Sequence, residues 1–173
     1  ISRIYWSPDG SKAAFACVGD KSSQLYILEA ASATAKPVAG LTLNGWSTAD
    51  FDINWLPDSQ QLVVLGNPQR VGPVPTNSAV PSGPAVQEHK GGKASARTFQ
   101  DLLKSSYDEQ LFEYYTASQV YLVAANGSSV KAVTPTASYD SVTPSPDGKY
   151  TAHFIDGPSQ NGVRTLYPVI TEG

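Results

Sequence analysis

The stretch Tyr5-Trp6-Ser7-Pro8-Asp9-Gly10 sets the pattern on which the whole chain is built. Proline presets the φ angle for the first position of a tight turn, and Asp or Gly accepts the geometry that follows, so Pro-Asp-Gly joins two antiparallel strands. The pattern returns twice, and each copy is followed by a polar residue or two and then an apolar run. The later copies are Asn54-Trp55-Leu56-Pro57-Asp58-Ser59 and Pro144-Ser145-Pro146-Asp147-Gly148.

A second element repeats in step with the first. Ser23-Gln24-Leu25-Tyr26-Ile27-Leu28 matches Ser118-Gln119-Val120-Tyr121-Leu122-Val123, and Thr165-Leu166-Tyr167-Pro168-Val169 is a weaker third copy. Asn126-Gly127, just after the second copy, is a strong hairpin signal. Each unit therefore reads as strand, turn, strand, loop, strand, turn, strand, which is one four-stranded sheet. Such sheets, repeated every 40–50 residues or so, are the blades of a β-propeller.

The spacing of the repeats predicts an insertion. Pro57 follows Pro8 by 49 residues, which fits one blade, but Pro146 follows Pro57 by 89 residues. The surplus lies between Gly66 and Ser118. Residues 66–92 contain ten Gly or Pro and no Phe, Trp or Tyr, a composition typical of an extended surface excursion.

The second half of the insertion has a helical period. From Thr98 onward, apolar residues recur at three- and four-residue steps, and both Thr98-x-x-Asp101 and Ser106-x-x-Glu109 fit the capping box. We expect two short helices, or one kinked near Ser105-Ser106. A helical arm then interrupts the second blade between its second and third strands.

These observations predict an all-β fold, a partial β-propeller of about three four-stranded antiparallel blades with a helical insertion in the second blade. It occupies residues 1–173 as a first blade (1–45), a second blade (46–135, insertion about 66–117) and a third, incomplete blade (136–173). Closed propellers usually have at least four blades. We therefore expect an unclosed arc with open faces, taken from a longer protein.

Composition narrows the possible partners. The chain has 173 residues, of which 40% are hydrophobic and 16% charged, with a net charge of −3. The hydrophobic fraction is too high for a disordered chain. The lack of a Lys/Arg-rich run argues against nucleic acid or a membrane surface as the main partner. Cys17, His89 and His153 are too widely spaced to predict a zinc site. The aspartates of the three turns are explained by turn chemistry, so we expect no metal and no cofactor.

The Trp-Ser-Pro-Asp-Gly units resemble propeller blades of the prolyl oligopeptidase class of serine peptidases, and equally those of TolB-like propellers. The insertion carries a more specific resemblance, to the non-catalytic propeller of the glutamyl endopeptidase branch. This resemblance extends over roughly residues 4–155 of the chain. Beyond Ile155 the family tends to continue with Pro-Phe-Ser, whereas this chain has Gly157-Pro158-Ser159-Gln160-Asn161. The segments that carry the resemblance are Val80-Pro81-Ser82-Gly83-Pro84, Ala96-Arg97-Thr98-Phe99-Gln100-Asp101-Leu102-Leu103-Lys104, Tyr107-Asp108-Glu109, Leu111-Phe112-Glu113-Tyr114-Tyr115 and Ser118-Gln119.

The resemblance implies a chloroplast or bacterial parent enzyme that cleaves peptide substrates after glutamate. Its C-terminal α/β-hydrolase domain would carry the Ser-Asp-His triad, with the propeller limiting access in cis. This chain has no Gly-x-Ser-x-Gly elbow, the strained turn on which the hydrolase nucleophile sits. We therefore expect no catalytic residue in this segment, and no turnover by it alone.

Four charged residues of the insertion are candidates for substrate binding. Arg97 or Arg70 is suited to hold a substrate carboxylate bidentately, although an ion pair of Arg97 with the arm is the commoner use of such a residue. Glu109 and Glu113 share a helix face at i and i+4. By analogy with related aminodipeptidases they would bind a substrate amine, and otherwise form a solvated flank.

Two alternatives to the endopeptidase stay open at this point. One is an exopeptidase propeller with Glu109 and Glu113 as amine anchors. The other is a TolB- or WD-like scaffold without peptidase activity, whose arm docks a protein. Under any of the three, we expect the arm aromatics Phe112, Tyr114 and Tyr115 to pack the arm onto its blade.

Overall fold

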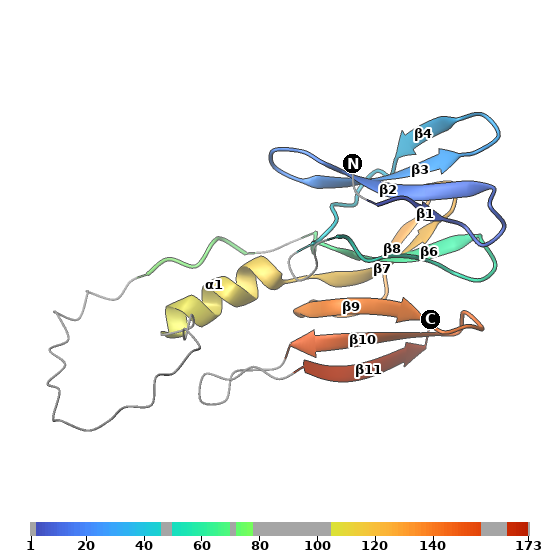
Figure 1. Ribbon diagram of the computed structural model, residues 1–173. Coiled ribbons are helices and arrows are strands. Elements are labelled where there is room, and N and C mark those ends of the chain that lie inside the picture. Colours follow the sequence, from blue (N-terminus) through green and yellow to red (C-terminus); the bar gives the residue numbers. More distant parts are fainter. Residues whose placement is uncertain (1–2, 46–49, 70–71, 78–104, 157–165, 173) are drawn as a thin grey trace, which may run out of the picture.

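The computed structural model describes residues 3–45, 50–69, 72–77, 105–156 and 166–172, with backbone alone for residues 152–156 and 166–172. Three antiparallel sheets are stacked in the order of the chain (Figure 1). The one helix among the described residues, α1 (Ser106–Thr116), projects from the middle sheet to one side of the stack.

The first sheet has the order β1-β2-β3-β4 and the second β5-β6-β7-β8, while the third has three strands in the order β11-β10-β9. The predicted partial propeller is thus confirmed, with α1 between the second and third strands of the second blade. The strands are β1 (Tyr5–Trp6), β2 (Lys12–Val18), β3 (Ser23–Glu29), β4 (Thr34–Pro37), β5 (Ile53–Trp55), β6 (Gln61–Gly66), β7 (Gln119–Ala124), β8 (Val130–Ala132), β9 (Tyr139–Pro144), β10 (Tyr150–Asp156) and β11 (Leu166–Glu172).

The aspartate of the first Pro-Asp turn fastens the turn itself. Gly10, at φ 71°, donates its N–H to the oxygen of Ser7 at 2.9 Å. The Asp9 carboxylate accepts from the hydroxyl of Ser7 at 2.7 Å and from the N–H of Ser11 at 3.0 Å. These bonds, the Ser11 backbone N–H first, lower the pKa of Asp9 to about 2. The third turn repeats the arrangement around Asp147, so turn chemistry accounts for the recurring aspartates.

The second turn uses a serine where the others have glycine. Ser59 has φ 59°, a conformation that costs a non-glycine residue free energy. Its side chain is 2% exposed, and its hydroxyl accepts from the N–H of Asp9 at 3.1 Å. The serine therefore joins the turn of the second blade to the turn of the first.

Two apolar layers hold the three sheets together. The layer between the first and second blades is centred on residues such as Leu25, Ile53 and Tyr121, each at most 2% exposed. The layer between the second and third blades contains Val63 and Tyr139 among its buried members. Strand alternation explains this, because successive side chains of one strand point to opposite faces and so serve opposite neighbours.

The innermost strand of the second blade bonds to both neighbouring blades. The indole N–H of Trp55 donates to the backbone oxygen of Tyr5 in the first blade at 2.8 Å. The side-chain amide of Asn54 donates to the backbone oxygen of Val142 in the third blade at 2.9 Å. Two consecutive residues of β5 thus fix the relative position of all three sheets.

Candidate functional site

The arm formed by α1 is anchored where the chain returns to the sheets. Within α1, all of which the structure describes, Thr116 alone is buried, and its hydroxyl is hydrogen-bonded to that of Ser138. The amide of Asn44 donates to the backbone oxygen of Ala117 at 3.1 Å. Asn44 lies between the first two blades and Ser138 between the second and third, so both blade connections hold the base of the arm.

The N-terminus of α1 is capped one residue earlier than the sequence predicted. Ser105, in an extended conformation, is the N-cap, and its hydroxyl oxygen accepts from the N–H of Asp108 at 3.2 Å. The Ser106-x-x-Glu109 capping box is therefore wrong by one position, because two adjacent serines each offer a cap and only the extended one has the required geometry. The predicted first helix, from Thr98, lies outside the described residues.

Glu109 and Glu113 are both on α1, one turn apart as predicted. Glu109 is half-buried and Glu113 is exposed. The first turn of α1 carries Asp108 and Glu109, and its last turn has no basic residue. The arm therefore presents a negatively charged flank, which favours binding a cationic group over an anionic one.

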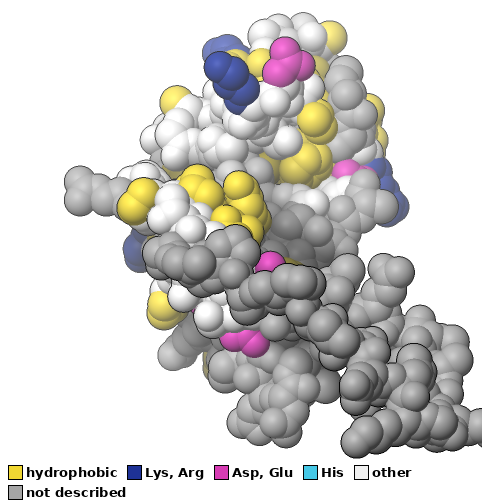
Figure 2. All heavy atoms as spheres, turned by 90° about the vertical axis from the view of Figure 1, so that its left-hand side faces the viewer, with side chains coloured by type: hydrophobic (Ala, Val, Ile, Leu, Met, Phe, Trp, Pro, Cys, Tyr) yellow, Lys and Arg dark blue, Asp and Glu magenta, His cyan; other side chains and the backbone are white. Residues whose placement is uncertain are grey.

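The other two residues predicted to bind substrate, Arg97 and Arg70, lie outside the described residues. Tyr115 is 63% exposed and meets the ring of Tyr114 edge-on, with ring centroids 5.2 Å apart. The prediction that Tyr115 packs the arm onto its blade is therefore wrong, because α1 leaves the sheets at its base and carries this ring into solvent. On the side from which α1 projects, exposed hydrophobic side chains gather close to acidic ones (Figure 2).

A second acidic group, which no sequence pattern singled out, lies beside the innermost strands. Asp52 immediately precedes β5, and one of its carboxylate oxygens is buried without a hydrogen bond to the described residues. Burial, and secondarily the charge of Asp140 on β9, raises the pKa of Asp52 to about 6. Nearby, the hydroxyl of Tyr5 donates to the backbone oxygen of Phe51 at 2.8 Å. Asp50-x-Asp52 just before an innermost strand was the signal available in the sequence.

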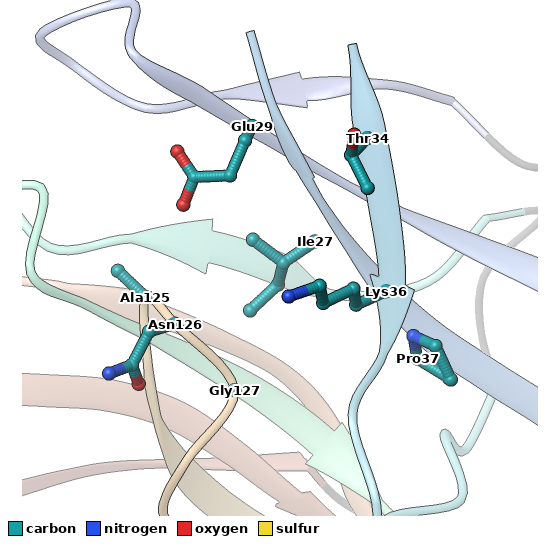
Figure 3. A pocket seen from close by; sticks show the side chains of 8 residues that line it. All are labelled: Ile27, Glu29, Thr34, Lys36, Pro37, Ala125, Asn126 and Gly127. Atoms are coloured by element: carbon teal, nitrogen blue, oxygen red, sulfur yellow. The ribbon is translucent and has the colours of Figure 1, made fainter. Parts of the chain in front are cut away.

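A small crevice lies between the first two blades, away from α1. It has a volume of about 120 Å³ and is lined by residues of β3, β4 and the β7–β8 turn. Lys36 extends into it beside Ile27 and Asn126 (Figure 3). Ligand pockets for small molecules are usually about 300 Å³ or more. The crevice is therefore a gap at the seam between blades, too small for a substrate.

The described part of the chain contains neither a cluster of metal-ligating side chains nor a membrane-spanning helix. No group of three or more His, Cys, Asp or Glu side chains is arranged there to hold a metal ion. The one helix described, α1, is too short and too polar to cross a membrane.

Two plant proteins are similar to this chain in sequence. No protein-family profile matches the chain. It is 36% identical over 160 residues to a probable chloroplastic glutamyl endopeptidase of Oryza sativa, and 32% identical over 163 residues to that of Arabidopsis thaliana. Each match covers 87% of this chain but 16% of the relative. The chain thus spans about a sixth of the length of these relatives.

Solved structures share the fold at low identity. TolB from Acinetobacter baumannii gives a TM-score of 0.55 at 15% identity, over 99% of this chain and 29% of TolB. The β-propeller domain of the trilobed protease from Pyrococcus furiosus gives 0.52 at 12%, over 99% and 40%. Acylaminoacyl peptidase from Pyrococcus horikoshii gives 0.52 at 14%, over 99% and 23%.

The solved structures identify the fold of the chain. The chain has a β-propeller fold of the kind found in TolB and in peptidases of the prolyl oligopeptidase class. In sequence the chain is similar to glutamyl endopeptidases over 87% of its length, so the resemblance predicted from the sequence is confirmed.

Proposed function

We propose that this chain is the non-catalytic propeller segment of a serine endopeptidase that cleaves after glutamate. In this proposal it limits peptide access to an α/β-hydrolase domain elsewhere in the parent, the complete polypeptide that contains the chain. The observation that carries the proposal is the 36% identity over 160 residues to a probable glutamyl endopeptidase. The lack of a Gly-x-Ser-x-Gly elbow in the chain supports a role without catalysis.

The proposed mechanism divides the work between two domains. In the parent, a hydrolase serine would attack the peptide carbonyl, with a histidine base and an oxyanion hole supplied by the same domain. The propeller would contribute a rigid wall, because its three sheets are joined by buried apolar layers and by the bonds of Asn54 and Trp55. The arm, pinned at Thr116, would reach beyond that wall.

The direct test compares the parent with the 173-residue chain on a quenched fluorescent peptide that contains one internal glutamate. We expect cleavage after glutamate by the parent and none by the chain. A matched peptide with glutamine in place of glutamate controls for charge recognition. Turnover by the isolated chain, or equal cleavage of both peptides by the parent, would overturn the proposal.

Arg97 and Arg70 remain the proposed cations for the substrate carboxylate. A charge-assisted hydrogen bond contributes about 1.5–3 kcal/mol, so Arg97→Gln in the parent is expected to lower kcat/KM for the glutamate peptide by about 10- to 100-fold. The glutamine peptide should be little affected. Arg70→Gln is the matched comparison, because it lies in the same insertion. If neither variant changes the preference for glutamate, the cation lies elsewhere.

The exopeptidase alternative rests on the shared face of Glu109 and Glu113. It predicts that acetylating the N-terminus of a peptide abolishes its cleavage, and that Glu109→Gln raises KM for free peptides alone. The endopeptidase proposal predicts equal cleavage of free and acetylated peptides. The scaffold alternative has weaker support, because the likeness to TolB concerns the fold alone.

A further inference from the structure

The glutamates of the chain lie in segments of very different stability. Glu29 ends β3, and Glu172 ends β11. Glu109 and Glu113 lie on α1, while Glu88 is outside the described residues. Because the proposed parent cleaves after glutamate, each of these residues marks a bond that the parent could cut in its own chain. The structure distinguishes the described glutamates by how firmly the backbone around each is held.

Glu29 is held on both sides by neighbouring strands. It pairs with Lys12 on β2 and with Thr34 on β4, so the strand that carries it is paired along both edges. The Lys12 ammonium forms an ion pair with its carboxylate, and the next N–H, that of Ala30, donates to the oxygen of Ser11 at 3.0 Å. A peptidase that binds its substrate as an extended chain reaches the Glu29–Ala30 bond only after these strands separate.

The arm is held much less firmly. α1 has 11 residues, and isolated helices shorter than about 12–15 residues are marginal in water. Thr116, at the last position of α1, is its one buried residue. The other end depends on the Ser105 cap, whose oxygens accept from the N–H groups of Asp108 at 3.2 Å and Glu109 at 3.1 Å. The first turns of α1 therefore open more readily than its last turn.

The two glutamates of α1 differ in their distance from the anchored end. The helical turn that follows the Glu109–Gln110 bond ends at Glu113, before the buried position. The turn that follows the Glu113–Tyr114 bond includes Thr116 and Ala117, which are hydrogen-bonded to the connections between blades. Opening from the N-terminal end of α1 thus releases Glu109 while the chain after Glu113 stays fixed.

A break in α1 leaves the second blade assembled. The arm lies between β6 and β7, and these strands pair along all six residues of β6. The hydroxyl of Tyr121 on β7 also donates to the oxygen of Asn67, just after β6, at 3.0 Å. Residues from both sides of the arm are buried in the same two apolar layers. The two halves of the chain are therefore held together by contacts that do not involve α1.

We propose that the Glu109–Gln110 bond is a proteolytic modification site, cut by a glutamate-specific peptidase while the propeller stays assembled. The step is a hydrolysis, in which the bond between the carbonyl carbon of Glu109 and the nitrogen of Gln110 breaks. Water supplies the hydroxyl of the new carboxylic acid and the proton that the new amine receives. The cut separates the insertion from its anchor at Thr116. The inference rests on the proposed function only in naming the parent as one such peptidase.

Limited proteolysis of the folded 173-residue chain tests the site, in a Glu88→Gln background. The chain is incubated with an unrelated glutamate-specific peptidase and, separately, with the parent, and the new termini are identified by mass spectrometry. We expect an early cut that yields residues 1–109 and 110–173, and these fragments should elute together in gel filtration. Cutting after Glu29 or Glu113 as fast as after Glu109 would overturn the proposal. So would fragments that separate without denaturant.

Three variants make the test specific. Glu109→Gln should abolish the early cut, and Glu113→Gln, the matched control on the same helix, should leave it in place. Ser105→Ala removes the N-cap. Because the cleavage rate follows the population of the open helix, cutting after Glu109 should become roughly fivefold faster, with no change at Glu29. A rate at Glu109 that does not respond to Ser105→Ala would mean that opening of α1 is not required, and the proposal would fail.

The use of two enzymes separates this proposal from the proposed function. Suppose that the unrelated peptidase cuts after Glu109, while the parent leaves both the chain and the peptide with one internal glutamate intact. The modification site then stands, and the proposed function fails. If instead the parent cleaves that peptide and neither enzyme cuts after Glu109, the proposed function stands and the modification site is refuted.

Discussion

Replacing Asp52 with asparagine is expected to stabilise the chain at neutral pH and to have a smaller effect under mildly acidic conditions. The pKa of Asp52 is raised to about 6, from an ordinary value of 3.8, first by burial and then by the charge of Asp140. The folded state therefore binds a proton more tightly than the unfolded state. For an acid this means that ionisation opposes folding, so the wild type gains stability as the pH falls from about 7 to about 4.

The size of the effect follows from the two pKa values. Their difference corresponds to about 3 kcal/mol between the folded and unfolded states above pH 7. The carboxyl group is still partly reached by water, and screening reduces the usable figure to about 1–2 kcal/mol. Asparagine keeps the shape and removes the charge, so Asp52→Asn should raise the free energy of unfolding by about that amount at pH 7.5.

The assay is urea unfolding of the 173-residue chain at several pH values between 5 and 8. This window avoids the titration of Asp9, whose pKa near 2 makes its contribution fall only at lower pH. Asp20→Asn, a change at an exposed loop carboxylate, is the matched control and should shift stability by less than about 0.5 kcal/mol throughout. If Asp52→Asn destabilises at pH 7.5, or its effect is the same at pH 5, the reasoning is refuted.

Three further predictions concern the blade contacts and the arm. Trp55→Phe removes the indole donor and leaves the oxygen of Tyr5 buried, so unfolding in urea should become easier by about 1–3 kcal/mol; an unchanged midpoint would mean that the bond contributes nothing. Ser59→Gly relieves the strain of the positive φ but loses the hydrogen bond from the N–H of Asp9, so its free energy of unfolding should stay within about 1 kcal/mol of wild type. Ser59→Ala loses the same bond and keeps the strain, so it should lower the free energy of unfolding by about 1–2 kcal/mol. Equal losses for glycine and alanine would contradict this account. Ser105→Ala removes the N-cap and should increase hydrogen exchange in the first turn of α1 by several-fold, as about 1 kcal/mol implies, with exchange in β7 as the control.

Features that depend on local chemistry were predicted well. The Pro-Asp turns and the Asn126-Gly127 hairpin are set by a few adjacent residues, and the strands on either side follow from them. The place of α1 followed from the extra length between Gly66 and Ser118. Its N-cap was misplaced because Ser105 and Ser106 are chemically equivalent, and only the backbone conformation of the folded chain distinguishes them.

Features that depend on neighbours could not be predicted in this way. Tyr115 has the character of a packing residue, yet the path of α1 away from the sheets leaves it exposed. Asp52 and Asp140 are far apart in sequence and influence each other only because adjacent blades place their innermost strands next to one another. A sequence pattern of a few residues does not indicate that these two carboxylates are close in space.

Trp6 and Trp55 have the same local sequence and opposite surroundings. Both precede a Pro-Asp turn at the end of a strand, and this place follows from the sequence because strand period and turn chemistry act over a few residues. The tertiary structure made one 9% exposed and hydrogen-bonded, and left the other 57% exposed. Burial belongs to a pair of surfaces, and only the stacking of the sheets determines which surface finds a neighbour.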